Sequence, residues 1–223
     1  MDKNLTDLLK WGIEHSASSN PQNDPSAPSG SPAPAPRSDL NPEILSALMG
    51  GPSDADLMKA AMEVLHDPTT TLENKLIAFD NFEQLIESLD NANNLENLSL
   101  WTPLLSLLSH EDPEIKKYAA WCVGTAVQNN AKSQERLLAM GGLPKLVDLI
   151  LHEGEDESVR KKAVYALSSA VRNYQPALDV AREELSKNGH GVDGEKVDAT
   201  DMDGVDKVME GLKERVESTS KKA

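Results

Sequence analysis

The residue types that most often carry enzyme chemistry are scattered through this sequence and share no characteristic spacing. A zinc site needs His and Cys ligands at short, fixed intervals, and a nucleophilic Ser or Cys needs a neighbouring base. The histidines are far apart in the chain and meet neither requirement: His15, His66, His110, His152 and His190. We therefore expect no catalytic residues, no metal site and no cofactor.

An acidic segment near the C-terminus resembles part of a calcium-binding loop. Such a loop places its ligands at fixed positions around a central glycine. When Gly204 is taken as that glycine, the first ligand position holds Ala199 rather than Asp198, so the match fails. The acidic residues are better explained as the start of a helix, where they interact favourably with the helix dipole.

A pair of similar segments organises the rest of the chain. Residues 115–129 and 159–173 match at a shift of about 44 residues, with Lys, Ala, Val and Asn at the same places and Trp121 opposite Tyr165. Self-similarity at this period is typical of stacked helical repeats. One repeat cannot bury its apolar stripe alone, so it must pack on its neighbours. The sequence therefore predicts an all-α helical-repeat solenoid.

One face of each repeat is expected to form part of a protein-binding groove. Trp121, Thr125 and Gln128 are spaced four and three residues apart, which places them on one side of a helix. The equivalent face of the next repeat carries Tyr165, Ser169 and Arg172. The polar residues between Asp80 and Asp90 either extend this groove or form the solvated side of a helix, and the sequence alone leaves both interpretations open.

The composition narrows the class of partner. The 223 residues carry a formal net charge of −15, which disfavours nucleic acid because affinity for phosphate backbones comes mainly from Lys and Arg. The same charge disfavours anionic membranes. The single cysteine excludes an internal disulfide, and no segment is apolar enough for a signal peptide or a membrane span. We expect a cytoplasmic monomer that binds a protein.

Changes in composition divide the chain into segments. Residues 1–15 are expected to form a short amphipathic arm, and residues 16–39 a disordered Pro/Ser/Ala-rich linker that has too little apolar area to fold. Capping helices are expected over 40–68, helical repeats over 69–186, and an acidic tail with one helix over 187–223. The arm either docks on the domain or acts as a detachable arm, since a helix this short is marginal alone.

Several motifs resemble known families. Residues 141–150 (GGLPKLVDLI) and 163–173 (AVYALSSAVRN) are similar to armadillo repeats, so we expect the repeats to be armadillo-like. Residues 76–98, followed by Trp101, closely resemble the fungal armadillo-type nucleotide exchange factors of DnaK-class heat-shock chaperones, as does GTAVQNN at 124–130. The motif Leu-Leu-Lys-Trp in the arm also fits that family.

The resemblance implies a co-chaperone without catalytic activity. Its groove would clasp the nucleotide-binding domain of a cytosolic DnaK-class chaperone and promote the release of ADP and of client protein. The arm would occupy the chaperone's substrate-binding domain through Leu5, Leu8, Leu9 and Trp11. The resemblance implies chaperone contacts at Asn81, Gln84, Glu87, Asp90, Asn91, Ala92, Asn93, Asn94, Thr125, Gln128, Asn129, Tyr165, Ser169 and Arg172.

The alternative function is that of an armadillo adaptor for a different protein or peptide. Armadillo import receptors, which bind basic localisation peptides, carry asparagine where this chain has Thr125 and Ser169. That departure weakens the import-receptor version of the alternative.

Overall fold

The computed structural model describes residues 52–190 and 197–220. They all belong to one compact unit, Ser46–Ala223. The predicted arm with Leu5, Leu8, Leu9 and Trp11, the predicted linker, and the helix expected to begin near Asn41 lie outside the described residues.

Helices make up the regular structure of the described residues, and no strand occurs among them. The prediction of an all-α fold is therefore confirmed. The helices are α3 (Asp54–His66), α4 (Leu72–Ile86), α5 (Leu89–Asn94), α6 (Trp101–Leu107), α7 (Pro113–Val127), α8 (Ala131–Ala139), α9 (Gly142–Leu151), α10 (Glu157–Val171), α11 (Gln175–Lys187) and α12 (Met202–Ser220).

Capping side chains fix where the long helices begin. Ser53 and Thr71 accept hydrogen bonds from backbone amides in the first turns of α3 and α4. Asp112 does the same for α7, which also has a proline in its first turn, and Asp156 for α10. Each cap satisfies an amide that has no partner within the helix. Between α8 and α9, Gly141 adopts a left-handed φ of 68°, which glycine accepts without a steric penalty.

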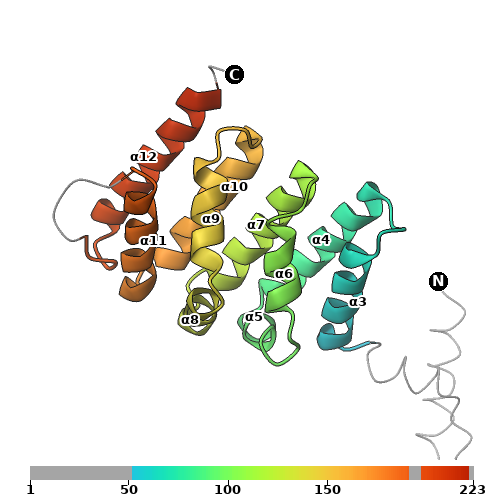
Figure 1. The fold of residues 1–223 in the computed structure, drawn as a ribbon. Coiled ribbons are helices and arrows are strands. Elements are labelled where there is room, and N and C mark those ends of the chain that lie inside the picture. Colours follow the sequence, from blue (N-terminus) through green and yellow to red (C-terminus); the bar gives the residue numbers. More distant parts are fainter. Residues whose placement is uncertain (1–51, 191–196, 221–223) are drawn as a thin grey trace, which may run out of the picture. The chain divides into compact units, whose positions relative to one another are not determined.

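The helices pack in two layers (Figure 1). Helices α4, α7, α10 and α12 lie side by side in that order, and we call them the inner row. Helices α6, α9 and α11 form the second layer, with the short helices α5 and α8 leading into it. The repeated segments 115–129 and 159–173 coincide with most of α7 and α10, which are direct neighbours as the stacking argument requires.

The C-terminal helix α12 is a packed member of this row. The side chain of Arg160 on α10 is fully buried and donates to the Ile150 carbonyl at 2.9 Å and to Thr219 Oγ1 on α12 at 2.7 Å. Lys161 of α10 forms an ion pair with Glu217 of α12, and Arg172, which caps the C-terminus of α10, forms one with Asp206 of α12. Arg160 therefore holds α12 in place.

The core follows the apolar stripe of each helix. Phe79, Phe82 and Ile86 of α4 are buried, whereas Leu72 and Leu89 are 41% and 56% exposed. Leu72 is the first residue of α4, and Leu89 lies beyond its end as the first residue of α5. Both leucines therefore fall outside the part of α4 that packs inward.

A candidate protein-binding groove

A pocket of about 500 Å³ opens across α4, α7 and α10, which are three neighbours of the inner row. We call it the polar pocket, because carboxylate, amide and hydroxyl groups alternate with two aromatic rings around it. Its lining residues are Glu83, Glu87, Trp121, Thr125, Gln128, Asn129 and Tyr165.

Hydrogen bonds between adjacent helices connect the walls of the polar pocket. Thr125 Oγ1 donates to Glu83 Oε1 at 2.7 Å, which joins α7 to α4. The Tyr165 hydroxyl donates to Gln128 Oε1 at 3.3 Å, which joins α10 to α7. These bonds set the relative positions of the three helices at the pocket, so its shape is defined by directional contacts.

The pocket lies above a closely packed contact between α7 and α10. A methyl group added at Gly124 would lie 2.5 Å from Tyr165 Cε1 and 3.1 Å from the Ala166 Cα, so glycine permits this approach. Cys122 is fully buried in the same helix. Burial raises the pKa of its thiol well above the usual value, and the negative charges of Glu83 and Asp80 add to the effect.

Both aromatic rings of the pocket already interact with a cation. The ammonium of Lys162 lies 4.6 Å from the centroid of the Trp121 ring and 5.4 Å from that of Tyr165. These separations are within the range of a cation–π interaction. The ring faces at this site are therefore suited to positive charge.

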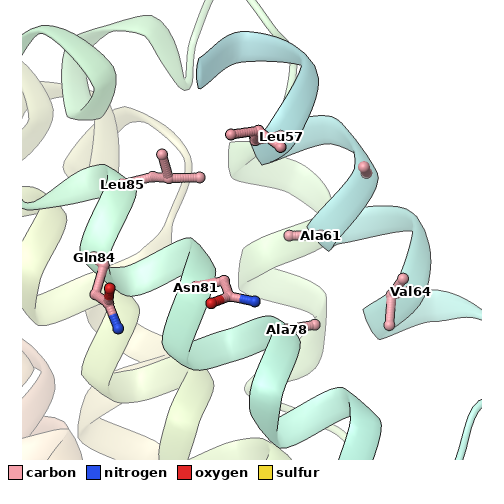
Figure 2. Close-up of a pocket in the computed structure, with 8 residues that line it drawn as sticks. Leu57, Ala61, Val64, Ala78, Asn81, Gln84 and Leu85 are labelled. Atoms are coloured by element: carbon pink, nitrogen blue, oxygen red, sulfur yellow. The ribbon is translucent and has the colours of Figure 1, made fainter. Parts of the chain in front are cut away.

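A second pocket of about 560 Å³ lies between α3 and α4, and we call it the apolar pocket. Figure 2 shows Leu57 of α3 across from Leu85 of α4, with Asn81 and Gln84 projecting from α4 beside them. Leu57 is 41% exposed. The full lining is Leu57, Ala60, Ala61, Val64, Ala78, Asn81, Gln84 and Leu85.

The structure divides the candidate contact residues among several surroundings. Five of them meet in the polar pocket: Glu87, Thr125, Gln128, Asn129 and Tyr165. Asn81 and Gln84 line the apolar pocket instead. Four more lie on the short helix α5: Asp90, Asn91, Asn93 and Asn94. Arg172 is half-buried and paired with Asp206 of α12.

Two of the candidate residues are not available as surface contacts. Ala92 is 2% exposed and Ser169 8% exposed, so α5 and α10 turn these side chains into the protein. The small size of Ala92 suits close packing within the chain rather than the close approach of a partner. The substitution Ala92→Arg is therefore expected to destabilise the domain, because it places a charge in the core.

Two pocket residues, Glu83 and Trp121, are absent from the predicted contact set, although helical spacing placed Trp121 on the groove face. A shift of about 44 residues would place Asn81 opposite Thr125, whereas the structure pairs Thr125 with Glu83. Helices α4, α7 and α10 begin at Leu72, Pro113 and Glu157, so the first interval is three residues shorter than the second. The N-caps Thr71 and Asp112, which are visible in the sequence, would have revealed this shorter interval.

Comparison with known proteins finds two matching family models and a solved structure with a similar fold. The family model described as nucleotide exchange factor Fes1 matches residues 5–95, and that of the SIL1/FES1/HPBP1 C-terminal domain matches residues 91–190. The crystal structure of an engineered protein superposes with a TM-score of 0.51 at 19% identity, over 79% of this chain and 71% of that one. That likeness concerns the fold alone. Among the described residues, no helix is both long and apolar enough to cross a membrane.

Relatives of nearly the same length share most of the sequence. The Hsp70 nucleotide exchange factor fes-1 of Neurospora crassa is 59% identical over 98% of this chain and 100% of its own. FES1 of Gibberella zeae is 61% identical over 96% of this chain and 98% of its own. FES1 of Coccidioides immitis is 51% identical over 96% of this chain and 99% of its own. With two family models matched in succession and identities this high over whole chains, the protein belongs to the Fes1 family of nucleotide exchange factors.

Proposed function

We propose that this chain is a nucleotide exchange factor for a cytosolic Hsp70, a chaperone of the DnaK class. The observation that carries the proposal is the end-to-end similarity to relatives named Hsp70 nucleotide exchange factors. The inner row supports it, because α4, α7 and α10 present an open pocket of polar side chains to a partner. The protein acts by binding, as a cytoplasmic monomer.

Exchange by binding alone is a coupling between two ligands of the chaperone. The factor binds one lobe of the nucleotide-binding domain more tightly when the cleft is open, and ADP favours the closed cleft. The coupling is reciprocal, so ADP expels the factor as strongly as the factor expels ADP. To weaken the binding of ADP to the chaperone a hundredfold, the factor must bind the open state more tightly than the closed state by about 2.7 kcal/mol. A few polar contacts can supply this difference.

The contact surface in this proposal consists of the candidate residues that remain accessible on the inner row. Those on α4 are Asn81, Gln84 and Glu87, and those at the end of α7 are Gln128 and Asn129. Thr125, Tyr165 and Arg172 form part of the same surface while holding adjacent helices together.

Release of a fluorescent ADP analogue from purified Hsp70 tests the proposal. The chain without substitutions is expected to accelerate ADP release. If the rate of ADP release is the same with and without the chain, exchange activity is ruled out. Asn81→Arg and Gln128→Arg, both at exposed positions of the inner row, should reduce the acceleration about tenfold or more. Glu135→Arg, at an exposed position of α8 in the other layer, should leave the rate unaltered.

The arm has a separate role in this proposal, which is to displace client protein from the chaperone. Deletion of residues 1–39 should leave ADP release intact and slow the release of a labelled client peptide. A parallel loss of both activities would show that the arm is needed for binding itself. Substitution of Leu5, Leu8, Leu9 and Trp11 by serine should reproduce the effect of the deletion on client release.

A further inference from the structure

The polar pocket contains two carboxylates, those of Glu83 and Glu87, that form no ion pair with the described residues. Glu83 is only 6% exposed, and one of its carboxylate oxygens accepts the bond from Thr125. Glu87 is exposed at the pocket's edge. Within residues 52–190 and 197–220, no Lys, Arg or His forms an ion pair with either carboxylate. A largely desolvated carboxylate without a counter-charge is unfavourable, so this pocket favours an incoming cation.

The remaining lining residues define the shape of that cation. The rings of Trp121 and Tyr165 offer flat faces for stacking, and the position of Lys162 near both rings shows that positive charge is accommodated there. The side-chain amides of Gln128 and Asn129 provide further acceptors at the rim. Aromatic faces, two carboxylates and amide oxygens together match a guanidinium group, which is planar, stacks on rings and donates five hydrogen bonds.

We propose that the polar pocket binds an arginine side chain that the Hsp70 chaperone presents to the groove. That Hsp70 supplies the arginine rests on the proposed function. That the pocket binds a guanidinium rests on the residues of the pocket alone. The guanidinium lies against Trp121 and Tyr165 and donates to the carboxylates of Glu83 and Glu87. A buried arginine in such a pocket is a common centre of binding energy in protein interfaces.

A small probe tests the chemistry of the pocket without the chaperone. Nα-acetyl-arginine amide is titrated into the full chain and followed by the NMR signals of the Trp121 indole and the Tyr165 ring. The shifts should saturate, and Nα-acetyl-citrulline amide, which has the same shape without the charge, should bind at least tenfold more weakly. Glu83→Gln and Glu87→Gln should each weaken arginine binding at least threefold, whereas Glu135→Gln on α8 should have no effect.

Measurement of the affinity for the nucleotide-binding domain of Hsp70 tests whether Hsp70 supplies the arginine. The double variant Glu83→Gln/Glu87→Gln should raise the Kd about tenfold, because hydrogen bonds between charged groups are lost. Its Kd should also depend less on salt than that of the unchanged chain. Should Glu83→Gln unfold, as judged by circular dichroism, the exposed Glu87→Gln alone still provides the comparison with Glu135→Gln.

The outcomes separate this inference from the function on which it rests. If the unchanged chain accelerates ADP release but the pocket variants bind Hsp70 within twofold of it, the pocket assignment is overturned and the function stands. Equal binding of arginine and citrulline amides overturns the assignment as well. If the unchanged chain neither binds Hsp70 nor releases ADP, the proposed function is overturned together with Hsp70 as the source of the arginine.

Discussion

The polar pocket and the apolar pocket are both lined in part by residues of α4, and their volumes are similar. Their linings are nevertheless opposite in character. The polar pocket lies across α4, α7 and α10, whose side chains exchange hydrogen bonds over the helix boundaries. The apolar pocket lies between α3 and α4 and is lined mainly by Ala, Val and Leu. Helix α4 therefore presents a carboxylate face on one side and an apolar face on the other.

This difference indicates what each pocket can recognise. Hydrogen bonds and charge are directional and penalise a wrong partner, since a buried polar group left without its partner is costly. Apolar contacts depend mainly on the area removed from water and discriminate less between ligands. The polar pocket is therefore the more selective of the two, and reactivity and stability measurements can establish whether it is also the more rigid.

The largest expected effect is the protection of Cys122, the chain's single cysteine, which is fully buried in α7, one of the three helices that line the polar pocket. Its thiol should react with a thiol-specific reagent about a thousandfold or more slowly than a free thiol, because the reaction requires opening of the fold. The matched control is Ala60→Cys in a Cys122→Ala background, which places a thiol at an exposed position of the apolar pocket. That thiol should react like a free one, and rapid labelling of Cys122 would show that the polar pocket opens easily.

The raised pKa of Cys122 also predicts a dependence of stability on pH. Below about pH 8.5, where a free thiol titrates, the thiol is protonated in both folded and unfolded chains and has no effect. Above that pH the unfolded chain releases the proton and the folded chain retains it, so the free energy of unfolding falls as pH rises. Urea unfolding between pH 8 and pH 10 should show a smaller decline in Cys122→Ala.

The next largest effect is expected for Gly124→Ala, because the added methyl group would collide with Tyr165 and approach the Ala166 backbone. Overpacking of this kind costs about 1–3 kcal/mol, and displacement of the Tyr165 ring would also deform the polar pocket. Urea unfolding and arginine amide binding should both weaken. Gly211→Ala in α12 is the control, since nothing lies within 4 Å of the added carbon, and it should leave stability unchanged or raise it slightly.

Much of the fold follows from local patterns in the sequence. The capping residues Ser53 and Thr71 and the apolar spacing of Phe79 and Phe82 correctly indicate helices and an inward face. The repeat of about 44 residues correctly places α7 beside α10, because identical spacing produces equivalent faces that pack on each other.

The polar pocket was only partly predictable. Gln128 and Tyr165 follow from helical spacing, but the burial of Ala92 does not, since alanine is compatible with core and surface alike. The role of Glu83 depends on a change of register between α4 and α7, which arises from the length of the intervening segment. The packing of α12 against α10 depends on Arg160, whose burial requires tertiary partners that are distant in sequence.

A smaller effect is expected at Asn129, which lines the polar pocket and follows the C-cap of α7 with a left-handed φ of 51°. Asn129→Ala should cost about 1 kcal/mol of stability, because alanine tolerates this conformation less well than asparagine, and Asn129→Gly should cost little. Both should weaken Hsp70 binding by removing the amide. Asn173 has the equivalent conformation at the end of α10, with a φ of 57°, outside the polar pocket. Asn173→Ala should cost similar stability without weakening binding.

The smallest expected effect is at Lys162, whose ammonium lies near both rings of the polar pocket. An incoming guanidinium is repelled by this charge, so Lys162→Gln should tighten the binding of Nα-acetyl-arginine amide about twofold, in keeping with the size of a single screened charge interaction. Lys161→Gln is the control, because Lys161 pairs with Glu157 and Glu217 rather than with the pocket rings. Weaker binding in Lys162→Gln would instead mean that this lysine holds Trp121 and Tyr165 in position. The selectivity of the polar pocket would then come from its rigid rings more than from its charge.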